Sequence, residues 1–133
     1  MVLLLRSLFA LEKDFSFDGR RQAAGLGLLV NDDRTLLLVA ELHGRVIGMC
    51  SGQTVISTAE GGPALLVEDV VVTADHQGKG IGTRLLESLQ KWAEERGISR
   101  LQLLADRTNS AALEFYKHQG WQTTQLICLR TYI

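Results

Sequence analysis

The chain has 133 residues, enough for one domain whose single core buries roughly two thirds of the unfolded surface. Hydrophobic residues make up 46% of it and charged residues 22%, as in ordinary soluble globular proteins. The net charge of −1 gives no general attraction to nucleic acid or anionic membranes, and no apolar run is long enough to span a bilayer. We therefore expect a single domain over residues 1–133 that has neither nucleic acid nor a membrane as partner.

The start of the chain and its two cysteines favour a cytoplasmic protein. The apolar residues 1–5 lack a preceding basic region and an obvious small-residue cleavage site, which favours an amphipathic helix over a signal peptide. Cys50 and Cys128 are far apart and stand alone, so we expect two buried free thiols rather than a disulfide. No spaced set of ligands supports a metal site, and none is expected.

The first half of the chain predicts two helices followed by an antiparallel meander. Helical periodicity covers residues 3–13 and, less regularly, residues 19–29, before a polar turn at residues 31–33. A strand over residues 35–41 leads through the tight turn at His43 and Gly44 to a partner strand over residues 45–58. A Gly-Gly-Pro turn then precedes a strongly β-branched strand over residues 64–73.

The second half alternates helices and strands. A helix over about residues 80–96 ends at Gly97, and a strand follows at residues 101–105. Asn109 or Ser110 caps a helix that runs to about residue 118, and residues 121–132 form a last strand. This order predicts an α/β (α+β) domain with one mixed, mostly antiparallel sheet flanked by helices.

The glycine-rich turn between the β-branched strand and the long helix is suited to binding a phosphate. Its glycines stand at alternate positions, so the backbone can approach a ligand closely, and the helix that follows adds unpaired N–H groups. The Walker pattern is excluded because Gly80 stands where it needs Ser or Thr. The spacing Gly-x-Gly-x-Gly also differs from the dinucleotide fingerprint. The turn comprises Gln77, Gly78, Lys79, Gly80, Ile81 and Gly82.

Two segments together resemble the GCN5-related N-acetyltransferase (GNAT) superfamily. Residues 77–82 fit its pattern Gln/Arg-x-x-Gly-x-Gly/Ala, and residues 106–121 resemble its segment with an Asn and a Tyr seven positions later, here Asn109 and Tyr116. The resemblance covers nearly the whole chain from about residue 3. Family members usually begin with a strand before the first helix. This chain begins almost inside that helix, so its first strand is truncated, absent or supplied otherwise.

The resemblance implies acetyl-coenzyme A as co-substrate. The backbone of Val70, Val71 and Val72 would pair with the pantetheine arm, and the amides from Gly78 through Thr83 would surround the pyrophosphate. Gln77 stands where the family often has Arg and keeps a hydrogen-bonding role. Asn109 would contact the coenzyme, and Tyr116 would protonate the departing thiolate. Taken alone, Asn109 is equally an ordinary helix cap and Tyr116 an ordinary core residue.

The general base is expected among two adjacent acids in the β-branched strand. Successive strand residues face opposite sides, so only one of Glu68 and Asp69 can point into a given pocket. The resemblance favours Glu68, as a partly buried carboxylate with a raised pKa. Alternatively, either acid pairs structurally with Arg45, Arg100 or another cation.

These features predict an N-acetyltransferase that transfers acetyl to a primary amine of a small molecule by direct attack in a ternary complex. Neither cysteine has a neighbouring His that would favour an acyl-cysteine intermediate. The alternatives are an acyl-coenzyme A binding module and a protein or peptide N-acetyltransferase subunit. We expect the acceptor near the first two helices, beside Phe15, Phe17, Arg20 and Arg21. A homodimer through an exposed sheet edge stays open.

Overall fold

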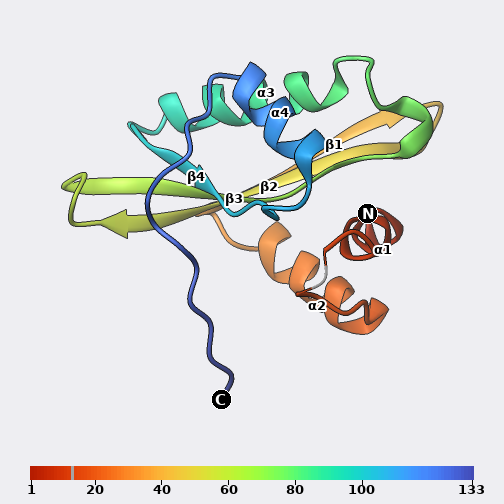
Figure 1. Cartoon of the computed structure of the whole chain (residues 1–133), viewed down its shortest axis with the longest axis horizontal. Helices are drawn as coiled ribbons and strands as arrows, with labels where there is room; N and C mark the ends of the chain where they lie inside the picture. Colours follow the sequence, from red (N-terminus) through yellow and green to blue (C-terminus); the bar gives the residue numbers. More distant parts are fainter. Residues whose placement is uncertain (13) are drawn as a thin grey trace. The chain divides into compact units, whose positions relative to one another are not determined.

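The computed structural model describes residues 1–12 and 14–133, which fall into two compact units, Met1–Leu103 and Leu104–Ile133. The first unit contains nearly all the regular structure (Figure 1). In chain order its elements are α1 (Val2–Phe9), α2 (Gly19–Val30), β1 (Thr35–Leu42), β2 (Arg45–Ser57), β3 (Gly62–Val72), the 3-10 turn η1 (Ala74–His76), α3 (Ile81–Glu94) and β4 (Leu101–Leu103). The second unit contains α4 (Ser110–His118).

The sheet has the strand order β1-β2-β3-β4. The first three strands form an antiparallel meander, and β4 joins β3 in parallel after the chain has passed through α3. His43 and Gly44 both have positive φ, 49° and 75°, as a two-residue hairpin turn between β1 and β2 requires. The predicted mixed, mostly antiparallel sheet flanked by helices is confirmed.

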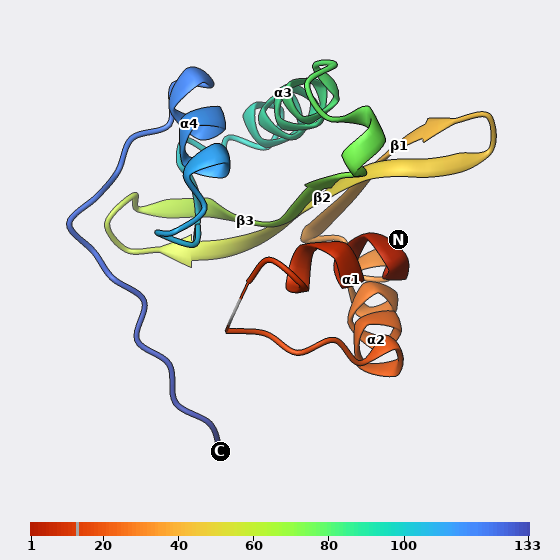
Figure 2. The ribbon, with the colours of Figure 1, turned by 45° about the vertical axis from the view of Figure 1, so that its right-hand side comes forward.

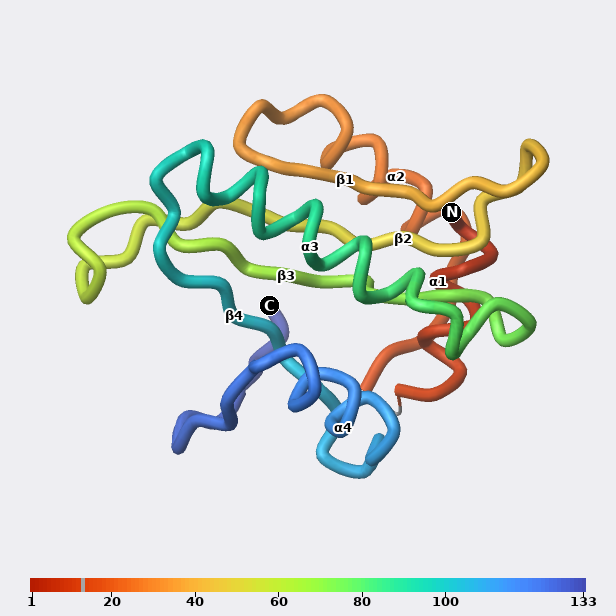
Figure 3. Tube along the Cα trace, turned by 90° about the horizontal axis from the view of Figure 1, so that it is seen from above, coloured from red at the N-terminus to blue at the C-terminus, as the bar shows by residue number. Residues whose placement is uncertain are grey.

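Helices cover both faces of this sheet (Figure 2). On one face α3 lies along the strands, as the view from above shows (Figure 3), and its Leu85 and Leu89 approach the glycines of β2. A Cβ at Gly52 would lie 3.0 Å from a side-chain atom of Leu65 and 3.1 Å from one of Leu89, so glycine allows α3 to pack this closely on β2. The opposite face packs on α1 and α2 through a cluster of Leu4, Leu5, Leu26 and Met49. The sheet of the first unit is therefore packed on both faces, by α3 on one and by α1 and α2 on the other.

Several predicted elements extend beyond the observed ones, among them the helix predicted over about residues 80–96, which is observed at Ile81–Glu94. The first helix ends at Phe9 rather than continuing to residue 13, and Lys13 itself lies outside the described residues. Leu11 is 66% exposed, so its side chain gives no packing that would support another turn. Likewise β4 ends at Leu103 instead of residue 105, because Leu104 is already exposed.

The predicted last strand over residues 121–132 is wrong. The segment has strand-like alternation, but among the described residues it forms no ladder with another strand, and Leu126, Ile127 and Leu129 are exposed. Because β-propensity expresses packing against neighbours, an apolar alternating segment without a partner does not form a strand. Cys128 is consequently exposed, which corrects the expectation of two buried thiols; Cys50 is buried, and both are free.

Within the described part of the chain, no helix combines the length and apolar character needed to cross a membrane. Nor do three or more His, Cys, Asp or Glu side chains gather there in a group suited to holding a metal ion.

Candidate functional site

The glycine loop, residues 77–82, connects the end of β3 and η1 to the start of α3. Gly78 and Gly80 have φ of 71° and 78°, in the left-handed region that other residues avoid. A Cβ at either position would meet nothing within 4 Å. These glycines are therefore required by the backbone path of the loop and not by crowding around it.

Most backbone amides of this loop donate no hydrogen bond to the described residues; the exception is Gln77 N, which donates to Ala74 O at 3.3 Å. Among the described residues, the amides of Gly78, Lys79, Gly80, Ile81 and Gly82 donate no hydrogen bond, whereas Arg84 N, further into the first turn of α3, donates to Gly80 O at 3.1 Å. Gly80 is the N-cap of α3 and has no side chain that could accept from the first turn. Five open donors at the positive end of a helix form an environment that favours an anion.

The polar side chains at the loop bond to the segment that precedes it, from the end of β3 through η1. Gln77 Nε2 donates to Val72 O at 3.0 Å, and Lys79 Nζ donates to Asp75 O at 3.0 Å. Thr73 Oγ1 and His76 Nδ1 lie 2.9 Å apart. These contacts hold the loop to β3 and η1 and leave the backbone amides of residues 78–82 available to a ligand.

A β-bulge interrupts β3 just before the three valines. Ser51 pairs with Glu68, and Met49 pairs with Val71, so two residues of β3, Asp69 and Val70, stand opposite Cys50 alone. Asp69 has φ of 54°, which Asp tolerates better than most residues. A bulge of this kind changes which side chains face each side of the sheet.

The bulge brings the two acids to the same face. Gln53 Nε2 donates to Glu68 Oε2 at 2.9 Å, and Ser51 Oγ lies 3.5 Å from Asp69 Oδ2. Ser51 and Gln53 are two residues apart on β2 and share the face of Met49, which α1 and α2 cover. The prediction that only one acid could point into a given pocket is therefore wrong, because it assumed a regular strand.

The two acids differ in their surroundings. The pKa of the Asp69 carboxyl is raised to about 6, mainly by burial and also by the nearby negative charge of Glu68, while the hydrogen bond from Ser51 opposes the shift. Glu68 is exposed. The partly buried carboxylate with a raised pKa, expected at Glu68, is thus found at Asp69. Arg100, a proposed structural partner of these acids, instead forms an ion pair with Glu60 at 3.1 Å.

Past the bulge, one edge of β3 has no strand beside it. Pairing with β4 covers only Leu65, Leu66 and Val67, while pairing with β2 continues to Val72. Among the described residues, the β4-side edge of residues 68–72 is therefore open. An extended chain with amide groups could pair there, as predicted for the pantetheine arm beside Val70, Val71 and Val72.

The second unit holds the other two predicted site residues. Asn109 Oδ1 accepts from Ala112 N at 3.1 Å, so Asn109 does cap α4, and its Nδ2 group remains for another partner. The Tyr116 ring lies against Phe115 and Trp121, with centroid distances of 5.3 and 5.9 Å. The contact of Asn109 with the coenzyme and the acid role of Tyr116 stay predictions.

The Cys50 thiol, which lies opposite the bulge, is in a state of low reactivity. Burial raises the pKa of its thiol to about 12, and Sγ lies 3.9 Å from Leu85 O. A thiol in this state holds almost no thiolate near neutral pH, which disfavours it as a nucleophile.

The region expected to bind the acceptor is exposed. Phe15 and Phe17 are 46% and 39% exposed, and the Arg6 guanidinium lies 6.0 Å from the Phe17 ring centroid. Arg20 and Arg21 are exposed at the start of α2, where Asp18 Oδ1 accepts from their backbone amides. These observations agree equally with an acceptor surface and with a solvated turn.

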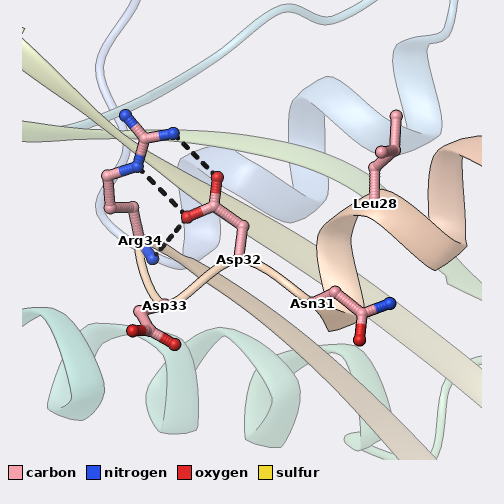
Figure 4. A pocket seen from close by; sticks show the side chains of 5 residues that line it. All are labelled: Leu28, Asn31, Asp32, Asp33 and Arg34. Atoms are coloured by element: carbon pink, nitrogen blue, oxygen red, sulfur yellow. Dashed lines mark hydrogen bonds and ion pairs between the residues drawn. The ribbon is translucent and has the colours of Figure 1, made fainter.

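A separate open hollow lies at the turn from α2 to β1 (Figure 4). Two of its three charged residues are already paired, because Arg34 Nη2 lies 2.8 Å from Asp32 Oδ2. The Arg34 hydrogen bonds lower the pKa of Asp32 to about 2. This pair closes the turn, and the hollow holds none of the predicted site residues. It is lined by Leu28, Asn31, Asp32, Asp33 and Arg34.

Sequence reasoning missed Ser51 and Gln53, the β2 partners of the two acids. The signal for them was weak, since polar residues in a strand become informative only once the register across the sheet is known.

The comparisons with known proteins identify the family. The family model described as "Acetyltransferase (GNAT) family" matches residues 4–121, and the chain belongs to this family. A streptothricin acetyltransferase of Streptomyces lavendulae is 31% identical over 90 residues, covering 68% of this chain and 45% of the relative. The chain spans less than half the length of this and other curated relatives that it matches.

Solved structures have the same fold. An aminoglycoside acetyltransferase from an uncultured soil metagenomic sample superposes with a TM-score of 0.80 at 21% identity, over 99% of this chain and 84% of the other. The ribosomal-protein-alanine N-acetyltransferase of Brucella melitensis biovar Abortus 2308 gives 0.76 at 26% identity, over 99% and 89%. The predicted GNAT fold is confirmed.

Proposed function

We propose that the chain is an N-acetyltransferase that transfers acetyl from acetyl-coenzyme A to a primary amine of a small molecule. The observation that carries the proposal is the group of five open amides, Gly78 to Gly82, at the start of α3. A diphosphate satisfies such donors with charge-assisted hydrogen bonds. Membership of the GNAT family supplies the reaction class.

The open edge of β3 suits the other part of the carrier. The pantetheine arm contains amides, which can bond to the backbone of Val70, Val71 and Val72 as an added strand would. A strand amide there would also polarise the thioester carbonyl, as in an oxyanion hole. Diphosphate and arm together would orient the thioester relative to the bulge at Asp69.

We assign the role of base to Asp69, in place of Glu68. The amine nitrogen attacks the carbonyl carbon, the C–S bond breaks, and the ammonium proton goes to a carboxylate. With a pKa of about 6, Asp69 is ionised at neutral pH and more basic than an ordinary Asp. Glu68 lies on the same face, and its negative charge helps to raise that pKa.

Tyr116 is the proposed acid that protonates the leaving thiolate, and Asn109 the proposed further contact to the coenzyme; both assignments come from the family resemblance. The state of Cys50, with its thiol pKa of about 12, supports direct attack by the amine over a Cys50 acyl intermediate. Cytoplasmic location and a homodimer remain part of the proposal.

The acceptor class rests on the relatives. A streptothricin acetyltransferase and an aminoglycoside acetyltransferase are among them, and both names specify small molecules. A second candidate, acetylation of a protein N-terminus, is favoured by the similarity to a ribosomal-protein-alanine N-acetyltransferase.

The test is a screen of purified protein against amines, antibiotics and N-terminal peptides, following thiol release from acetyl-coenzyme A. We expect release with a small amine; release with peptides alone would favour the second candidate. Tyr116→Phe separates an enzyme from a binding module. An enzyme loses turnover while still binding coenzyme A, whereas a module releases no thiol with or without the change.

A further inference from the structure

We propose that Gln77 is a positioning residue, whose side-chain amide holds the glycine loop to the end of β3 and does not bind the diphosphate itself. The inference deepens the proposed function, on which it rests. It corrects the simplest interpretation of the loop sequence, in which every polar side chain of the loop touches the ligand.

The hydrogen bond of Gln77 spans two elements. Its Nε2 donates to the carbonyl of Val72 at 3.0 Å, and Val72 is the last residue of β3. Val72 is also the last β3 residue that pairs with β2, through Gly48. The bond therefore joins the exposed loop to a point that the sheet already fixes.

Lys79 provides the contrast within the same loop. Its Nζ donates to Asp75 O at 3.0 Å, a residue of the adjoining turn η1 and not of the strand. An ammonium group has three donors and a full charge, so Lys79 can contact an anion while keeping this bond. Gln77 carries no charge. If its side-chain amide turned toward the ligand, the Val72 carbonyl would lose this hydrogen-bond donor.

The hydrogen bond between Gln77 and Val72 affects the sites proposed for both the diphosphate and the pantetheine arm. Along the chain, the loop amides of residues 78–82 follow Gln77, and the open edge of β3 ends at Val72, the partner of Gln77. Loosening this hydrogen bond disturbs both the diphosphate site and the edge at Val70, Val71 and Val72. Loss of the Lys79 charge disturbs the diphosphate site alone.

The experiment compares two acetyl donors, acetyl-coenzyme A and acetyl-pantetheine, which lacks the diphosphate. Gln77→Leu removes the donor, Gln77→Arg restores one, and Lys79→Met removes the charge. Ser88→Ala is the matched control, since Ser88 Oγ also donates to a backbone carbonyl, Arg84 O, on an exposed surface. The readouts are kcat/KM for each donor and the melting temperature.

We expect Gln77→Leu to lower kcat/KM about tenfold for both donors, the worth of one hydrogen bond. Gln77→Arg restores the value for acetyl-pantetheine, and Lys79→Met lowers the value for acetyl-coenzyme A only. Ser88→Ala changes neither. If Gln77→Leu affects acetyl-coenzyme A alone, Gln77 binds the diphosphate and the inference is wrong. Equal values for wild type and Gln77→Leu with both donors overturn it as well.

A second readout does not need turnover. This readout is an NMR titration of the protein, without any acetyl donor, with inorganic pyrophosphate. We expect the backbone amide resonances of residues 78–82 to shift while the side-chain amide resonances of Gln77 keep their positions. A large shift of the Gln77 side chain would contradict the inference. If wild type uses neither donor, the proposed function fails, whereas this titration still decides the role of Gln77.

Discussion

The two halves of β3 have similar apolar sequences and different surroundings. Before the bulge, Ala64, Leu65 and Val67 are at most 1% exposed, and Leu65 to Val67 have strand partners on both sides. After it, Val70, Val71 and Val72 are half-buried, and among the described residues β2 is the only strand beside them. The first half is held by strands on both sides, and the second leaves its β4-side edge unpaired among the described residues. Asp69 marks the boundary.

The largest expected effect is the loss of kcat on replacement of Asp69, the residue between the two halves of β3. Asp69→Asn keeps a residue that tolerates positive φ but removes the base, so we expect kcat to fall by about 10²–10⁴-fold. Steady-state kinetics with the best acceptor from the screen measures this. Glu68→Gln is the matched control, for which a small loss and a shift of the pH profile toward lower pH are expected. The reverse ranking would return the role of base to Glu68.

The next effect concerns stability and compares the two halves directly. Leu65→Ala should lower the free energy of unfolding by about 2–5 kcal/mol, because it opens a cavity at a fully buried position. Val71→Ala, in the half-buried part, should cost only about 1 kcal/mol. Urea unfolding of the two variants gives both values. Equal losses would mean that the two halves contribute alike to stability.

A pH effect on stability should follow from Asp69. Its pKa in the folded chain, about 6, lies above the ordinary value of 3.8, so the folded state holds the proton more tightly. This contribution is fully present below about pH 4 and is lost as pH rises through 6, by at most about 3 kcal/mol. Urea unfolding across this range measures it, and Asp69→Asn should lack it. If the free energy of unfolding of Asp69→Asn depends on pH as it does in the wild type, other groups cause the effect.

The smallest expected effect tests the backbone of the loop. Gly80→Ala should cost about 1–2 kcal/mol, seen as lower stability or weaker coenzyme A binding, because φ is 78°. Gly27→Ala in α2 is the control, since a Cβ also meets nothing there, and it should stabilise by about 0.5–1 kcal/mol. Thermal melts and calorimetry distinguish the two. A harmless Gly80→Ala would show that the loop does not need its left-handed residue.

Much of the fold was predictable because its signals are local. The His43-Gly44 turn, the apolar periodicity of α3 and the Asn109 cap are each readable within one element. The bulge was not, since an extra residue in one strand shows only against the register of its neighbour. For the same reason the sequence assigned Glu68 the burial found at Asp69. The strand predicted over residues 121–132 was wrong because an alternating pattern does not specify a partner strand.

The central claim is that the open amides of the glycine loop hold the diphosphate of the acyl carrier. Titration of isotope-labelled protein with coenzyme A, observed by NMR, tests it most directly, with pantetheine as the control ligand. We predict that coenzyme A gives its largest amide shifts at residues 78–82 and that pantetheine does not. Binding of coenzyme A without any change at these amides would contradict the account.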